Sequence, residues 1–223
     1  NPSRNKGEKK SDEPTTYWCY RTTGRKEDLW LAVIGCIADH HLPDFVKEFK
    51  EHYSEFWSEK EIKDPFDAYY GTEIGKIAMS FNFGLKDSIT HVIQLQNYLI
   101  SVKSPNDIFQ EVGTNYSFRM KYSEVKKKYD ELLEKAKQNT SEKLIFFEYS
   151  GDLSISSDIA NELSYLYPKK YIAVAYKKGV IFNLSLRGKG VKKILETILK
   201  EIEGTGGGHE GAVGARIQTK YLE

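Results

Sequence analysis

The sequence predicts an α/β protein in which a helical segment is followed by a small α/β domain built on a mixed sheet. Apolar residues recur at helical spacing from residue 29 to residue 138, whereas after about residue 140 they form β-branched and aromatic runs. Glycines bound those runs. Of the 223 residues, 39% are hydrophobic, which is enough to form a buried core.

Helices are expected throughout the first part of the chain. The stretch 29–38 is almost wholly apolar and follows Glu27 and Asp28, as is typical of the start of a buried helix. Other segments have a single apolar face and are expected to form amphipathic helices. They are 44–57, 66–80, 85–102 and 118–138.

Strands are expected in the second part. Two β-rich runs cover 143–151 and 169–188, and a Lys-Lys-Gly turn at 177–179 divides the second run into a hairpin. Helices are expected at 155–166 and 190–203, and a last strand at 214–222. With a boundary near 137–143, the chain divides into three expected parts: 1–43, 44–139 and 140–223.

The composition excludes several classes of protein. Two cysteines are too few for a disulfide framework or a cysteine zinc site, and no apolar run is long enough for a membrane span or a secretory leader. A cytoplasmic protein with no membrane partner is therefore expected. Its 33 basic and 32 acidic residues give a net charge of +1, so any site for an anion must be local.

A dense glycine cluster near the C-terminus is the first candidate site. Gly206, Gly207 and Gly208 precede His209 in what we interpret as a terminal loop after a helix. A helix cap, the alternative, needs only one glycine. Successive glycine amides can surround an anion, and histidine adds a donor near neutral pH, so phosphate is the expected ligand.

A serine and an arginine in the preceding strand form the second candidate. Ser185 and Arg187 alternate along the strand and therefore point to one face. A guanidinium matches the shape of a phosphate, and a hydroxyl can bind the same anion. A solvated strand end is the alternative for these two residues alone, but together with the glycine cluster they favour phosphate binding.

The third candidate is Asp39-His40-His41, which emerges from the most apolar stretch of the chain. Asp and His are ligands that suit Mn²⁺, Mg²⁺ or Zn²⁺. The alternative is a turn aspartate before Pro43 with two exposed histidines. The chain supplies no complete set of metal ligands in either case.

The pairing of "SLRGKG" with "GGGHEGAVGARI" in a C-terminal α/β domain resembles the DHH-associated domain of the DHH phosphoesterase superfamily, which includes the RecJ-like single-strand exonucleases. The resemblance implies that 1–43 is the end of a DHH domain, 44–139 a helical connector and 140–223 the DHH-associated, substrate-binding domain. It further implies that six residues contact nucleic-acid phosphate: Ser185, Arg187, Gly206, Gly207, Gly208 and His209.

Asp39-His40-His41 is not expected to be the triplet that gives the superfamily its name. The order of Asn1-Pro2-Ser3, the apolar helix and Asp39 resembles the part after that triplet, which makes Asp39 the last metal-binding aspartate, with His40 as an additional candidate. The cofactor implied is Mn²⁺ or Mg²⁺, in a two-metal site mostly supplied by an N-terminal DHH part. The chain contains no Asp-x-Asp pair to hold both ions.

The function implied by the resemblance is the substrate-binding C-terminal half or subunit of a metal-dependent 5′ to 3′ exonuclease of DNA replication and repair. Its implied partners are single-stranded DNA or RNA, a second chain with the N-terminal DHH motifs and, as further candidates, replisome proteins. The connector lacks an arginine at 80–88, where RecJ-like proteins often carry one. Two alternatives stay open: a DHH phosphodiesterase for short oligoribonucleotides or cyclic dinucleotides, and a non-catalytic nucleic-acid-binding scaffold.

Overall fold

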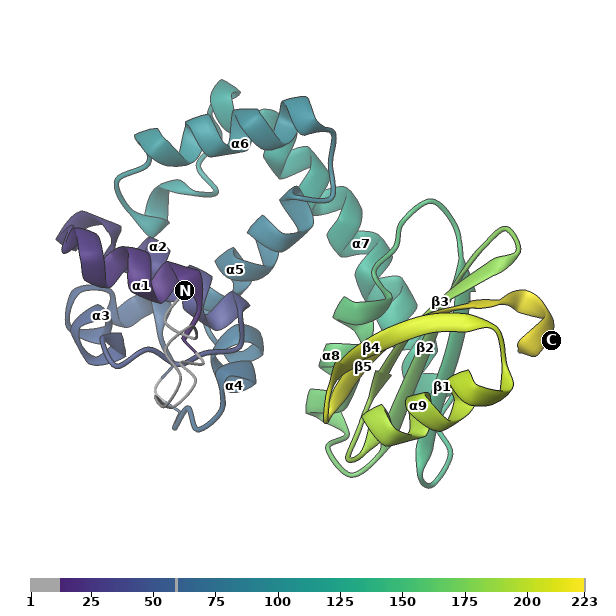
Figure 1. The fold of residues 1–223 in the computed structure, drawn as a ribbon. Helices are drawn as coiled ribbons and strands as arrows, with labels where there is room; N and C mark the ends of the chain where they lie inside the picture. Colours follow the sequence, from purple (N-terminus) through teal and green to yellow (C-terminus); the bar gives the residue numbers. More distant parts are fainter. Residues whose placement is uncertain (1–12, 59, 223) are drawn as a thin grey trace. The chain divides into compact units, whose positions relative to one another are not determined.

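A computed structural model describes residues 13–58 and 60–222. The chain forms two compact units that divide after Ser123. The Asn1-Pro2-Ser3 segment lies outside the described residues. The division falls within helix α7, Tyr116–Gln138, which supplies residues to both units (Figure 1). The three-part division expected from the sequence stays a prediction.

The described part of the first unit is built from α-helices and short 3₁₀ turns. Its α-helices before α7 are α1 Thr15–Thr23, α2 Leu29–Ala38, α3 Val46–His52, α4 Pro65–Gly71, α5 Glu73–Gly84 and α6 Ile89–Ser101. The 3₁₀ turns are η2 Lys26–Asp28, η3 Ser54–Phe56, η4 Pro105–Asp107 and η5 Gly113–Asn115. Helix α2 packs against α1, α4 and α5, and Trp30 and Ile37 of α2 are fully buried.

The expected buried helix at 29–38 is confirmed, whereas two expected helices are interrupted. The segment 44–57 holds α3 and the separate turn η3, and the segment 66–80 is divided between α4 and α5. The second break has a clear cause: the Thr72 hydroxyl accepts a hydrogen bond from the Gly75 amide at 2.9 Å and so caps α5.

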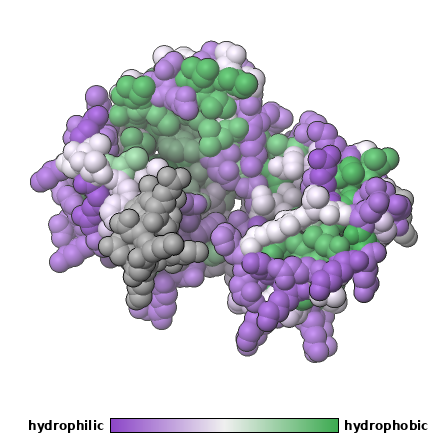
Figure 2. Space-filling model, in the orientation of Figure 1, coloured by the Kyte–Doolittle hydropathy of each residue, from purple (hydrophilic) through white to green (hydrophobic). Residues whose placement is uncertain are grey.

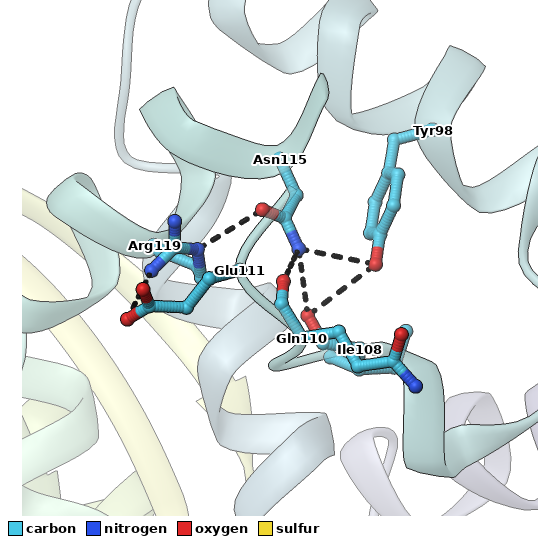
Figure 3. A network of polar contacts seen from close by, with 6 residues as sticks. All are labelled: Tyr98, Ile108, Gln110, Glu111, Asn115 and Arg119. Carbon is cyan, nitrogen blue, oxygen red and sulfur yellow. Dashed lines mark hydrogen bonds and ion pairs between the residues drawn. The ribbon is translucent and has the colours of Figure 1, made fainter. Parts of the chain in front are cut away.

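The segment between α6 and α7 is organised by one buried amide (Figure 3). Asn115 is 1% exposed, and its amide nitrogen donates to the Gln110 and Ile108 carbonyls at 2.7 and 3.2 Å and to the Tyr98 hydroxyl at 3.1 Å. Its amide oxygen accepts from Nε of Arg119 at 3.0 Å. Every polar atom of this buried side chain is therefore used, which fixes the segment's path.

Helix α6 presents an apolar face to solvent. Ile89 and Ile100 are 80% and 79% exposed, and Ile93 lies between them on the same side of the helix. Figure 2 shows apolar surface gathered over this helix. None of the helices in the described residues is both long and apolar enough to cross a membrane.

The second unit contains a mixed sheet, as the sequence predicts, but it has five strands where the sequence predicts four, because residues 204–209 form an additional strand. The strands are β1 Leu144–Ser150, β2 Tyr171–Lys178, β3 Ile181–Arg187, β4 Gly204–His209 and β5 Ala212–Gln218, in the order β1-β2-β3-β5-β4. Only β1 and β2 are parallel, because helix α8, Ser156–Leu166, makes the crossover between them. Helix α9, Val191–Glu201, joins β3 to β4, and the turn η6, Thr219–Tyr221, follows β5.

Helices α8 and α9 of this unit lie on opposite faces of the sheet. Helix α8 packs over β2 and β3 on the face to which Ser185 and Arg187 point. Helix α9 packs on β4 and β5 from the other side, where Val191 and Leu195 contact Val213 and Ala215 (Figure 1). The core therefore has two layers, one on each side of the sheet.

Candidate functional site

The glycine-histidine stretch is not the loop that the sequence suggested. Gly204–His209 form strand β4, which pairs in antiparallel register with β5 at the edge of the sheet. Glycine has low strand propensity, so the sequence favoured a loop, but the backbone pairing with β5 supplies the structure. Because a strand alternates its side chains between two faces, consecutive glycines here have different surroundings.

Register across the sheet brings four of the six predicted residues, Ser185, Arg187, Gly207 and His209, into rows on one face. Gly207 lies opposite Gly214, which lies opposite Ser185, and these positions form the glycine row. In the next row, His209 lies opposite Ala212 and Ala212 opposite Arg187. The separate sequence motifs therefore meet on one face through strand pairing.

This face is uncovered over β5 and β4, and we call that part the open face. The side chains of β5 that point toward α9, such as Val213 and Ala215, are buried, whereas Gly214 and Arg216 are exposed. On β4, Gly207 and His209 are exposed as well. A Cβ atom built on Gly207 would meet no heavy atom within 4 Å, and one on Gly214 would meet only the Leu184 carbonyl oxygen, at 3.7 Å. The glycine row therefore exposes main chain that a ligand can approach closely.

The other glycines of β4 point to the α9 face and are confined. A Cβ atom on Gly206 would lie 2.7 Å from the Gly214 carbonyl oxygen, and one on Gly208 would lie 2.4 Å from the Ala212 carbonyl oxygen. Gly208 also has φ +146°, which L-residues rarely adopt. Packing alone accounts for these two glycines, while their contact with phosphate stays a prediction.

Ser185 and Arg187 are held by α8. Ser185 is 6% exposed, and its hydroxyl lies 3.0 Å from the Ser156 hydroxyl in the first turn of α8. Nε of Arg187 donates to the Asn161 amide oxygen at 2.7 Å, and Nη1 donates to the Leu186 carbonyl at 2.8 Å. These bonds orient the half-buried guanidinium, which reduces the entropy it would lose on binding an anion.

Arg216 is a cation of the open face that is not among the predicted site residues. It lies in the row beyond the glycine row, opposite Thr205 on one side and Asn183 on the other. Among the described residues, the side chains of Arg216 and His209 make no hydrogen bond or ion pair. The sequence could have indicated Arg216, because residues 214 and 216 are two positions apart on a predicted strand and therefore lie on the same face.

The candidate metal ligand Asp39 follows the last turn of α2 and is exposed. His40 adopts φ 56°, and its ring centroid lies 4.2 Å from that of Phe66. The His41 ring lies 5.7 Å from the Tyr17 ring. Both histidine rings thus pack against aromatic rings, and this packing role does not require a metal.

A complete metal site is missing from residues 13–58 and 60–222, where no group of three or more His, Cys, Asp or Glu side chains could hold an ion. Burial raises the pKa of the nearby Cys36 thiol to about 12, so without a bound metal this side chain is a protonated thiol at neutral pH. The residues present do not fit the implied two-metal centre by themselves.

Comparison with known proteins gives structural but not sequence matches. No family model and no curated protein matches the sequence significantly. RecJ from Thermus thermophilus in complex with Mg²⁺ matches with a TM-score of 0.55 at 12% identity, over 90% of this chain and 34% of that one. The same protein with Mn²⁺ matches with a TM-score of 0.54 at 10% identity, over 92% and 32%.

A structure of exonuclease RecJ bound to manganese matches with a TM-score of 0.56 at 15% identity, over 92% of this chain and 55% of that one. The chain therefore spans between a third and about half of the RecJ structures that it matches. At these identities the likeness establishes the fold, so the RecJ-like α/β fold predicted from the sequence is confirmed.

Proposed function

We propose that this chain is the substrate-binding C-terminal part of a RecJ-like hydrolase and that the open face holds the phosphate backbone of single-stranded nucleic acid. On this proposal, 1–43 ends a DHH domain, 44–139 is the connector and 140–223 is the substrate-binding domain. The observation that carries the proposal is the glycine row, whose exposed main chain is flanked by Arg187 and His209.

The chemistry of the open face suits a phosphodiester. The oriented guanidinium of Arg187 can donate to phosphate oxygens, and His209 can add a donor from β4. The absence of side chains at Gly207 and Gly214 leaves room for the sugar-phosphate chain. Since these contacts address the backbone rather than base edges, binding is expected to be weakly dependent on sequence and strongly dependent on salt.

Binding is tested by fluorescence anisotropy with labelled single-stranded DNA and RNA of mixed sequence. His209→Ala is expected to weaken binding about fivefold to tenfold, the cost of one charge-assisted hydrogen bond. The matched control is Lys193→Ala, an exposed cation on α9, which packs on the opposite face. If the unmodified chain binds neither nucleic acid, or if His209→Ala binds as the control does, the proposal is wrong.

Cleavage requires more carboxylates than residues 13–58 and 60–222 bring together. We propose that Asp39 contributes one ligand to a centre for Mn²⁺ or Mg²⁺ and that a DHH part outside this chain, or a second chain, contributes the rest. His40 stays an additional candidate. The fold shared with metal-bound RecJ structures supports this assignment.

The catalytic proposal is tested by measuring release of nucleotides from 5′-labelled single strands in the presence of Mn²⁺. The chain is assayed alone and together with a candidate chain that carries Asp-x-Asp and DHH motifs. We expect activity only in the mixture, and expect Asp39→Asn to abolish it while binding persists. Full activity of Asp39→Asn would remove this residue from the metal site.

A further inference from the structure

The open face continues beyond the residues that the proposed function uses. On the far side of the glycine row, Thr205, Arg216 and Asn183 lie opposite one another across β4, β5 and β3. Thr205 and Arg216 are exposed and Asn183 is half-buried. The row of His209, Ala212 and Arg187 lies on the other side of the glycine row. An arginine, Arg187 or Arg216, is therefore present in each row that flanks the glycines.

The main chain of the two cationic rows is separated by more than the width of one phosphate group. Ala212 and Arg216 are four positions apart on β5, which corresponds to about 13 Å along a strand. A single phosphate group held by Arg187 and His209 therefore cannot also lie over the row of Arg216. A nucleic-acid strand that crosses the glycine row brings further phosphates to it.

Charge on the open face favours such an anion. None of the positions in the three rows, from β4 across to β3, is acidic. At the Arg216 end, Glu203 accepts a hydrogen bond from Gln218 at 3.3 Å and lies 3.9 Å from the Lys220 ammonium. At the other end, Glu210 lies in the turn between β4 and β5, beyond the rows.

We propose that Arg216, with Thr205, forms a second phosphate subsite, so that the open face selects strands with several consecutive phosphodiesters over ligands with only one. This inference rests on the proposed function and extends it, because it names the length of substrate that the site prefers. Asn183 is placed to donate from its amide to the same phosphate or to the adjoining nucleotide.

The experiment compares two ligands with the full chain: a thymidine 12-mer and a thymidine dinucleotide with one phosphodiester. The 12-mer is followed by anisotropy at several salt concentrations, and the dinucleotide by amide shifts in NMR at millimolar concentration. The variants are Arg216→Gln, Arg216→Lys, His209→Ala and the control Lys193→Gln. Unfolding midpoints equal to that of the unmodified chain confirm that each variant is folded.

Arg216→Gln is expected to weaken 12-mer binding about fivefold or more. It should also reduce the steepness of the plot of log K against log salt concentration by about 0.7, the value for one phosphate contact on a single strand. Dinucleotide binding should stay within about twofold. Arg216→Lys should restore the salt dependence, because it restores the charge. His209→Ala should weaken both ligands.

Two results would overturn the second subsite. One is an Arg216→Gln variant that binds the 12-mer as the control does. The other is an equal loss for both ligands, which would place Arg216 in the same subsite as His209. Failure of the proposed function looks different, since the unmodified chain would then bind neither ligand or His209→Ala would have no effect on either.

Discussion

The two sides of strand β4 use the same residue type for opposite purposes. Toward α9, Gly206 and Gly208 are glycine because neighbouring carbonyl oxygens leave no room for a Cβ atom. Toward the open face, Gly207 has free space above it, and so does Gly214 on β5 apart from one distant carbonyl. On the α9 face, packing thus excludes a side chain. On the open face, only a bound ligand would exclude one.

This difference separates structural from functional glycines within one short run of sequence. Substitution of the confined Gly206 or Gly208 should change the free energy of unfolding. Substitution of the exposed Gly207 or Gly214 should change the affinity for nucleic acid.

Gly208→Ala should destabilise the protein by about 3 kcal/mol, through strain at positive φ and overlap with the Ala212 carbonyl. The measurement is urea unfolding followed by circular dichroism. A loss below about 0.5 kcal/mol, which is ordinary for a surface substitution, would show that β4 can shift and that the packing argument is wrong.

Gly207→Val should have the opposite pattern. A β-branched residue on an exposed strand with ordinary φ should raise stability by about 0.5 kcal/mol, because it restricts the unfolded chain. Its side chain would occupy the glycine row and weaken binding of single-stranded DNA about tenfold or more, the equivalent of about 1.4 kcal/mol. Unfolding and anisotropy measured on the same sample check both effects. Unchanged binding would mean that no ligand approaches Gly207.

Ser185 lies at the border between the open face and the part of the same sheet face that α8 covers. Its substitution therefore tests whether its role is structural or functional. Ser185→Ala leaves the Ser156 hydroxyl without this partner and should cost about 1 kcal/mol, whereas Ser156→Ala combined with Ser185→Ala should cost less. A double-mutant cycle by urea unfolding measures the coupling. If Ser185 also binds phosphate, the double variant should regain stability but not affinity, and recovery of both would restrict Ser185 to a structural role.

The smallest effect is expected at Glu162, a residue of α8. Burial raises the pKa of this carboxyl, and hydrogen bonding from Tyr129 and the charge of Lys137 offset part of that rise. Because of the raised pKa, the folded state binds this proton at a higher pH than the unfolded state does. The group therefore makes the protein less stable as pH rises from about 4.5 through the raised pKa.

Glu162→Gln should therefore stabilise the protein at pH 7, and the gain over the unmodified chain should shrink as pH falls toward 4. Thermal unfolding between these pH values measures it. The gain is expected to be modest, because Gln can still accept the Tyr129 hydrogen bond. A variant that is less stable at pH 7 would indicate that the carboxylate's attraction to Lys137 outweighs its burial.

Much of the fold was predictable because it depends on local patterns. The apolar run at 29–38, the hairpin of β2 and β3 and the mixed sheet follow from periodicity and turn residues. The break at Thr72 was missed, because one hydroxyl cap ends a pattern that otherwise continues. The resemblance to RecJ-like proteins, read from the serine-arginine and glycine-histidine motifs, agrees with the structural matches.

The candidate site stays a prediction, but its arrangement in the fold can be compared with the sequence. The sequence motifs group Ser185, Arg187 and the glycines, yet which glycine lies on the open face depends on the pairing register between β4 and β5. The contacts of Ser185 with Ser156 and of Arg187 with Asn161 join residues 29 and 26 positions apart, which no local pattern encodes. Arg216 gained significance only when its row was known.

Because the glycine row spans the edge strand and its neighbour, occupancy of the site should be visible in amide hydrogen exchange. Strand β4 has a partner on one side only and carries almost no side chains, so its opening should be among the least costly in the sheet. A nucleic-acid strand lying across β4 and β5 would have to leave before that opening. Slower exchange at residues 206–209 on addition of ligand, with little change in β1, would then report binding residue by residue.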